Sequence, residues 1–152
     1  MHELDDKARL VAATCALSRI RQASRTITQL YEAAFKDIGL GAGQFTALVA
    51  MRVAGDAGIP LTRLANALVL DRTSLTRTLK PLEKAGLAKS GSDRADARVR
   101  RIRLTAKGAD KLAQALERWD VAQRGFVARV GAAAWAALNQ DLGNVVRALG
   151  DD

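Results

Sequence analysis

The strongest constraint on the fold of this chain is a pair of short amphipathic segments joined by a two-residue connection. The first segment, residues 63–68, follows Thr62, and the second, residues 72–85, follows Asp71; both residue types commonly cap helix N-termini. Gly86 comes directly after the second segment, at a position where glycine favours helix termination. Two short helices with so tight a connection predict a helix-turn-helix motif.

A β-hairpin is predicted directly after this motif. Residues 87–90 and 99–104 form its two strands, and the polar residues 91–97 form its tip. Because side chains alternate along a strand, Ile102 and Leu104 share one face of the second strand and arginines occupy the other. The expected unit is therefore a helix-turn-helix with a β-wing.

Helical segments flank this unit on both sides. Apolar residues recur at helical spacing over residues 4–38, 44–53, 106–129 and 133–149. Glycines interrupt the pattern at residues 39–43 and at Gly131, residues 55–60 are predicted to form a turn, and Thr105 is a suitable cap for the third helix. The predicted fold class is mainly α: a winged helix-turn-helix with a short β-hairpin, flanked by long N- and C-terminal helices.

Positive charge is concentrated in the winged unit. The chain has 152 residues, a length typical of one domain, and a net charge of +8. Residues 61–108 hold twelve of the 24 Lys and Arg residues but four of the 16 Asp and Glu residues, so this third of the chain accounts for the whole net charge. A basic stretch between neutral flanks is typical of a surface that binds a polyanion, although a solvated basic face gives the same count.

The second helix of the motif divides into an apolar and a basic face. Leu75, Leu79 and Leu82 recur at helical spacing and are expected to pack inward. The opposite stripe consists of Thr73, Thr76, Arg77 and Lys80. Such side chains suit base edges in the major groove, whereas Arg72 and Ser74, at the helix N-terminus, are expected to meet phosphates. An exposed helix that is merely soluble would carry similar residues.

Pro81 interrupts the helical pattern of this segment. Proline removes one helical hydrogen bond and disfavours helical geometry in the residue before it. We therefore expect either a bend at Pro81 or the end of the DNA-reading part near Lys80.

The wing supplies a second set of basic residues. We expect its DNA contacts to be Arg94, Arg98, Arg101 and Arg103, because arginines on a β-ribbon can enter a narrow minor groove. Asp96 lies two residues before Arg98, and we interpret the pair as an ion pair that shapes the wing.

These segments resemble the MarR family of transcriptional regulators. The resemblance is carried by LTRLANALVLDRTSLTRTLKPLEKAGL (61–87) and DRADARVRRIRLTAKG (93–108), together with the order of elements over almost the whole chain. The second stretch contains the family's Asp-x-Arg wing followed by Leu-Thr-x-x-Gly, here Asp96, Arg98, Leu104, Thr105 and Gly108.

The resemblance implies a homodimer that binds double-stranded DNA at near-palindromic operators, most often as a repressor released by a small acidic or aromatic ligand. Residues 60–105 would be the DNA-binding lobe of a single domain spanning residues 1–152, and residues 1–55 and 106–152 the helical dimerisation and effector region. In the family, Asp96 and Arg98 would hold the wing. The residue between them is often a basic tip residue but is Ala97 here, so Arg94 is the candidate substitute.

The flanking helices themselves favour a dimer. They offer more apolar residues than one small lobe needs: Leu10, Leu17, Leu112, Leu116, Trp119, Phe126, Trp135, Leu138, Leu142, Val145, Val146 and Leu149. Trp119 and Trp135 are interpreted as core or interface residues. A two-fold axis would place two recognition helices about 34–36 Å apart, one turn of DNA.

Two alternatives are open for release from DNA. Arg21, Tyr31, Phe45 and Met51 are candidates to line an effector pocket, although core packing also explains Phe45 and Met51. Cys15 is either a buried structural cysteine or a redox sensor, since a reactive thiol needs access and a favourable electrostatic environment.

Other classes of protein are disfavoured. The single histidine, His2, and the single cysteine cannot build a zinc site or a Ser–His–Asp triad, so we expect no enzyme, no metal and no cofactor. The N-terminus lacks the pattern of a signal peptide and no long apolar run occurs, so we expect a cytoplasmic protein without a membrane span. The main rival is a non-specific architectural DNA binder or an RNA binder; residues 61–108 lack the aromatic residues that RNA binders use for stacking.

Overall fold

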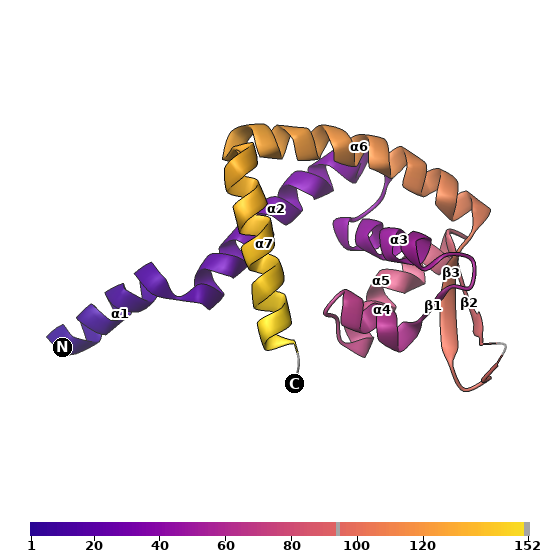
Figure 1. Ribbon diagram of the computed structural model, residues 1–152, viewed down its shortest axis with the longest axis horizontal. Helices are drawn as coiled ribbons and strands as arrows, with labels where there is room; N and C mark the ends of the chain where they lie inside the picture. The colour runs from indigo at the N-terminus through magenta and orange to yellow at the C-terminus, as the bar shows by residue number, and fades with distance from the viewer. Residues whose placement is uncertain (94, 151–152) are drawn as a thin grey trace.

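A computed structural model describes residues 1–93 and 95–150 of the chain. Over these residues the elements are α1 (His2–Thr14), α2 (Ala16–Phe35), the 3-10 helix η1 (Lys36–Ile38), α3 (Ala42–Ala54), β1 (Ile59–Pro60), α4 (Leu61–Ala67), α5 (Arg72–Lys84), β2 (Ala88–Ser92), β3 (Arg100–Leu104), α6 (Ala106–Val130) and α7 (Ala132–Leu149). The predicted fold class is confirmed. We call α3, α4, α5 and the three strands the winged-helix lobe; α1 projects away from it and α6 connects it to α7 (Figure 1).

The sheet of the lobe has three strands in the order β1–β3–β2. β2 and β3 form the predicted antiparallel hairpin, in which Ser90 pairs with Ile102. β1 was not predicted, because a two-residue strand carries no periodic signal; it pairs Ile59 with the other edge of Ile102. Proline is tolerated in such an edge strand, and Pro60 ends β1.

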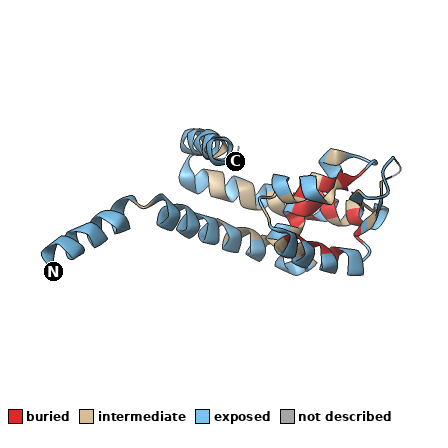
Figure 2. Cartoon of the chain, turned by 90° about the horizontal axis from the view of Figure 1, so that it is seen from below, coloured by how far each residue is buried: buried red, intermediate tan, exposed pale blue. Residues whose placement is uncertain are grey.

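The hydrophobic core lies within the lobe and where α2 and α6 cross it. Fully buried side chains come from five elements: Phe35 (α2), Leu48 and Met51 (α3), Leu64 (α4), Leu82 (α5) and Ile102 (β3). Figure 2 shows the buried residues gathered at this end of the molecule, whereas α1 and α7 are exposed along almost their whole length. Among the described residues, no helix is long and apolar enough to cross a membrane.

The helix caps confirm some predictions and correct one. Asp71 caps α5 and Thr105 caps α6, each by accepting a hydrogen bond from a backbone N–H three residues later. Thr62 was predicted to cap α4, but it lies in the first turn of that helix instead. The reason is that β1 extends as far as Pro60, which itself stands at the N-cap with φ −56°, so the helix begins at Leu61.

The single helix predicted over residues 4–38 is wrong. The chain leaves helical geometry at Cys15, whose ψ is 112°, and again at η1, which ends at Gly39 with φ 64°. No residue of α1 is buried, so no packing enforces one continuous helix there. The Thr14 hydroxyl also donates to the Leu10 carbonyl, a contact that favours bending at a helix end.

Pro81 does not end α5. α5 continues through it to Lys84, and the Pro81 carbonyl accepts a hydrogen bond from the Ala85 N–H. The helix itself therefore does not end near Lys80, and the expectation that its DNA-reading part ends there stays a prediction. Gly86 follows with φ 71°, the left-handed conformation that glycine adopts readily.

The first turn of α6 packs directly on the connection between α5 and β2. The Thr105 N–H donates to the Leu87 carbonyl and its hydroxyl to the Gly86 carbonyl, and Lys107 Nζ donates to the Ala85 carbonyl. A Cβ on Gly108 would lie 1.9 Å from the Leu87 carbonyl oxygen, so only glycine allows this approach. α6 and α5 are thereby fixed to one another.

We predict that Gly108→Ala lowers the free energy of unfolding by about 1–3 kcal/mol or more, because the added methyl group must displace the Leu87 backbone. Gly125→Ala, in the same helix, is the matched control: among the described residues no atom would meet its Cβ within 4 Å, so it should stabilise by up to about 1 kcal/mol. Urea unfolding measures both. Equal effects of the two substitutions would show that the close approach is not required.

Candidate nucleic-acid interface

The outer face of α5 presents the predicted stripe to solvent. Leu75, Leu79 and Leu82 are 4%, 4% and 1% exposed and attach the helix to the core. Because these residues fix the rotation of the helix about its axis, the opposite side chains point outward. The exposed residues of this stripe and of the first turn are Arg72, Thr73, Thr76, Arg77 and Lys80, and Pro81, Glu83 and Lys84 are exposed in the last turn. The helix therefore offers two arginines, a lysine and two threonines on an unobstructed surface.

Hydrogen bonds within α5 restrict what its polar side chains can do. The Thr76 hydroxyl donates to the Arg72 carbonyl (2.8 Å), which leaves the methyl group as the part that suits a thymine. The Ser74 N–H and hydroxyl donate to the two oxygens of Asp71 (2.8 and 2.7 Å). These bonds hold the pKa of Asp71 below its usual value. Both donors of Ser74 are thus engaged by the cap residue Asp71, and its contact with a phosphate stays a prediction.

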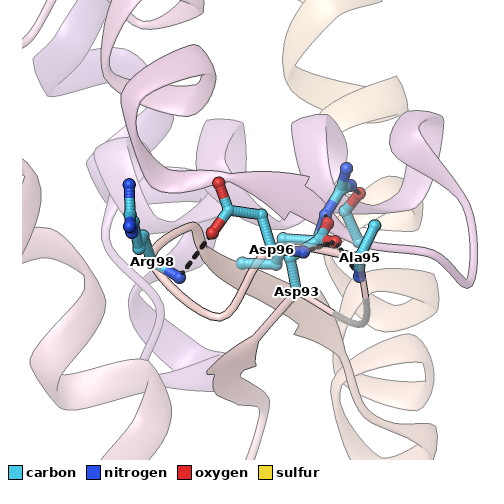
Figure 3. A network of polar contacts seen from close by, with 6 residues as sticks. Asp93, Ala95, Asp96 and Arg98 are labelled. Atoms are coloured by element: carbon cyan, nitrogen blue, oxygen red, sulfur yellow. Dashed lines mark hydrogen bonds and ion pairs between the residues drawn. The ribbon is translucent and has the colours of Figure 1, made fainter.

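The tip of the wing is organised by two aspartates (Figure 3). One oxygen of Asp93 accepts the backbone N–H groups of Ala95 (2.7 Å) and Asp96 (3.2 Å), and Asp96 accepts the N–H of Arg98 (3.0 Å). The Asp93 N–H donates to the Val99 carbonyl, which closes the loop at its base. The wing thus takes its shape from carboxylates bound to backbone amides.

The ion pair predicted between Asp96 and Arg98 is wrong. Asp96 binds the Arg98 backbone, and the ion pair of the described wing joins Asp93 to Arg101 instead.

Hydrogen bonds from the Ala95 N–H, and next from Arg101, hold the pKa of Asp93 below its usual value. The folded-state pKa is lowered, so this contribution to stability is complete above the ordinary carboxyl pKa and is lost as pH falls through the lowered value.

Arg101, one of the predicted DNA contacts, already has partners within the lobe, and its contact with DNA stays a prediction. Its guanidinium binds Asp93 and also donates to the Gly58 carbonyl (2.9 Å), and its side chain is 29% exposed. The residue thus joins the wing to the turn before β1, and we assign it to wing support. A Cβ on Gly58 would lie 2.6 Å from the Ile102 carbonyl, so this turn also packs closely on β3.

The other arginines of the wing differ in whether the structure describes them. Arg98 and Arg103 are exposed, as their predicted role requires, and Arg100 is exposed as well. Arg94 lies outside the described residues. The Ser90 N–H donates to Glu83 of α5 (3.2 Å), so β2 and the recognition helix are held together.

The four candidate effector residues lie in different surroundings. Phe45 and Met51 are buried in the core, and the Phe45 ring lies 4.7 Å from that of Phe35. Tyr31 donates to Gln123 of α6, and its burial raises its pKa. Arg21 lies near the exposed N-terminal end of α2. Arg21 borders one hollow and Met51 another, and the effector pocket predicted from Arg21, Tyr31, Phe45 and Met51 stays a prediction.

Cys15 stands between α1 and α2, where it is the N-cap of α2 and is partly exposed. It is not a buried residue, which was one of its two expected states. Together with Arg21 and Arg25 it borders a shallow hollow of about 620 Å³. Its role as a redox sensor stays a prediction. Within residues 1–93 and 95–150, no cluster of three or more His, Cys, Asp or Glu side chains could hold a metal ion.

Similarity to known proteins agrees with this geometry. No protein-family model matches the sequence. YybA of Bacillus subtilis, an uncharacterized HTH-type transcriptional regulator, is 30% identical over 92 residues, which cover 60% of this chain and 60% of YybA. The transcriptional regulator MosR of M. tuberculosis, solved in complex with DNA, is 33% identical over 89% of this chain and 96% of MosR, with a TM-score of 0.78. The chain belongs to the MarR family.

Other members of the MarR family share the architecture at lower identity. E. coli MarR, solved as a mutant with operator DNA, is 24% identical, with coverage of 90% of this chain and 98% of that protein and a TM-score of 0.79. At this identity the likeness shows the fold alone. The similarity to MosR and YybA, at 30% identity or more, shows that the chain is a DNA-binding transcriptional regulator of the MarR type, as its sequence predicts.

The position of Asp93 is a feature that the sequence interpretation missed. The sequence interpretation counted Asp93 only as an acidic residue. Aspartate commonly accepts a hydrogen bond from the backbone N–H two residues later, and here that residue is Ala95.

We predict that Asp93→Ala accelerates amide hydrogen exchange of Ala95 and Asp96 by about 2- to 12-fold, equivalent to hydrogen bonds of about 0.5–1.5 kcal/mol. Nuclear magnetic resonance measures each amide separately.

Asp96→Ala is the matched control for this measurement. It should accelerate exchange of the Arg98 amide and leave that of Ala95 unchanged, since Asp96 accepts from Arg98. If Asp93→Ala left the Ala95 and Asp96 amides as protected as before, Asp93 would not organise the wing.

Proposed function

We propose that this chain is a homodimeric repressor that binds a near-palindromic operator and is released by a small molecule. The observation that carries the proposal is the outward stripe of α5, whose Thr73, Thr76, Arg77 and Lys80 are exposed while its leucines are buried. In this proposal Arg77 reads a base in the major groove, because arginine can donate two hydrogen bonds to guanine.

The wing contributes the second contact. Arg98 and Arg103 are exposed on it and carry charge without a described ion-pair partner, whereas Arg101 is held by Asp93. We assign Arg98, Arg103 and Arg94 to the minor groove or the adjacent phosphates, and Arg72 to a phosphate near the N-terminus of α5. Residues 60–105 form the DNA-binding region in this account.

The proposal of a homodimer rests on apolar side chains that this chain alone leaves in water. They lie on the four long helices: Leu4, Leu10 and Val11 on α1, Leu17 and Ile20 on α2, Leu116, Val121 and Val130 on α6, and Leu138, Val145, Val146 and Leu149 on α7. Leu149 is 78% exposed and Leu4 is 72% exposed. Soluble monomers rarely leave so many apolar residues on neighbouring elements exposed, so a second copy is the proposed cover.

The sequence specificity of the complex tests the regulatory role. Arg77→Ala is expected to weaken operator binding by about 1–3 kcal/mol and to reduce discrimination at one base pair of each half-site. Arg52→Ala, which removes the same charge from α3, is the control and should leave discrimination intact. Fluorescence anisotropy with single-substituted operators measures both. A uniform loss over all sequences would make Arg77 a phosphate contact, and equal affinity for random DNA would favour an architectural protein.

The oligomeric state tests the other half of the proposal. The wild-type chain is expected to sediment with the mass of two chains, whereas Val146→Glu combined with Leu149→Glu shifts it toward one chain, because carboxylates buried in an apolar interface are strongly unfavourable. Val53→Glu is the control: Val53 is 83% exposed but lies on the lobe, so the dimer should persist. A monomeric wild-type chain at micromolar concentration would refute the dimer.

A further inference from the structure

α1 is a helix that the rest of the described chain does not support. It has 13 residues, none of them is buried, and no side chain caps its N-terminus. An isolated helix of this length is marginal in water, because most helices owe their stability to the packing of one face. The chain leaves helical geometry at Cys15, and α1 projects away from α7 and from the winged-helix lobe (Figure 1). α1 therefore needs a partner outside its own chain.

One face of α1 suits such a partner. Leu4, Ala8 and Val11 recur at helical spacing and are all exposed, Leu4 to 72% and Val11 to 56%. Glu3 and Asp5 stand in the first turn of the helix, on either side of this stripe. The face thus consists of an apolar stripe with two carboxylates at its N-terminal end.

A hollow of about 580 Å³ lies between the C-terminal end of α7 and the turn that joins α4 to α5. Its apolar lining includes Ala65, Val69, Leu70 and Val146. Val69 has φ 51°, in the left-handed region that β-branched residues rarely adopt. It is also 77% exposed, so packing within this chain does not offset the strain. Strained residues are concentrated at binding and switch regions, which marks this turn as a contact surface.

The charges of the hollow complement those of α1. Arg147 lines the hollow, and its guanidinium donates to a neutral amide of its own helix. Asp71 also lines the hollow, but its two oxygens are already bound by the N–H and the hydroxyl of Ser74. The cation is therefore the charge that is left to a partner, and α1 brings the carboxylates of Glu3 and Asp5 beside its apolar stripe.

We propose that α1 of one copy packs into this hollow of a second copy, between its α7 and its α4–α5 turn. The two copies exchange their α1 helices reciprocally, as a two-fold axis requires. The inference rests on the proposed homodimer and goes beyond it, because it gives α1 a contact with the helix-turn-helix motif itself. Since α5 begins at the end of this turn, the contact holds α5 of the second copy at a fixed place relative to the dimer axis.

Paramagnetic relaxation between two full-length chains tests this placement. A nitroxide is attached at Asp6→Cys, on the face of α1 opposite the stripe, in a Cys15→Ser background. This chain is mixed with an equal amount of unmodified chain that alone carries nitrogen-15, so that any broadening arises between chains. The amides of Val69 and Leu70 are expected to broaden, whereas that of Lys89, on β2, should stay sharp.

Amide hydrogen exchange in the last turn of α1 measures the strength of the contact. Arg147→Glu should accelerate this exchange by about two- to fivefold, the range of an exposed ion pair. Glu3→Lys combined with Asp5→Lys should do the same, and all three substitutions together should restore slow exchange, because the charges are then reversed on both sides. Arg52→Glu makes the same change of charge on α3 and is the matched control, which should leave exchange in α1 unchanged.

Three results would overturn the inference. One is a sample that sediments as two chains but shows no broadening at Val69 and Leu70. Another is broadening of these amides when nitrogen-15 is moved to the nitroxide-bearing chain and that chain is diluted in excess unmodified chain, since α1 would then lie on its own lobe. The third is exchange in α1 that no charge reversal alters. A sample that sediments as one chain would instead refute the homodimer itself, and with it this contact.

Discussion

The packing of three leucines of α5 into the core of the lobe is the interaction on which the rest of the structure depends. Leu75, Leu79 and Leu82 meet a core contributed by α2, α3, α4, β3 and α6, and this contact sets which side of α5 faces water. Asp71 fixes where the helix begins, and the bonds of Thr105 to Gly86 and Leu87 fix its end against α6. A basic stripe can serve recognition only if its orientation is fixed in this way.

The wing is held by charged side chains rather than by apolar packing. Its arginines are not equivalent, since Arg101 is bound inside the lobe whereas Arg98 and Arg103 are exposed. Asp93 is bound to Arg101 and to the amides of Ala95 and Asp96, so polar contacts hold the described part of the wing tip in place. The basic surplus of residues 61–108 is therefore divided between structural support and the proposed contact with DNA.

Local signals predicted most of the fold, because capping residues, glycines and apolar spacing report on neighbours close in the sequence. They located α5, the hairpin and the start of α6 to within a few residues. They failed where the decisive partner is distant: β1 forms only because Ile59 meets Ile102, and Arg101 is turned inward by Asp93 and Gly58. The break at Cys15 was missed because exposed helices keep their periodicity in sequence whether or not they are continuous.

The candidate site, like the fold, was predictable only in part from the sequence. The exposed residues of α5 follow directly from helical spacing, whereas the effector residues could not be placed, because Arg21 and Tyr31 are separated along α2 and Phe45 and Met51 fill the core.

The most direct test of the central claim is cleavage of DNA by a metal chelate tethered to α5. The chelate is attached at Thr73→Cys in a Cys15→Ser background, with Glu117→Cys on α6 as the control position. If the stripe of α5 enters the major groove of a dimer's operator, strand cuts should form two clusters about 10 base pairs apart that are absent with the control. Cuts spread evenly along the duplex, or equal patterns from both positions, would contradict the account.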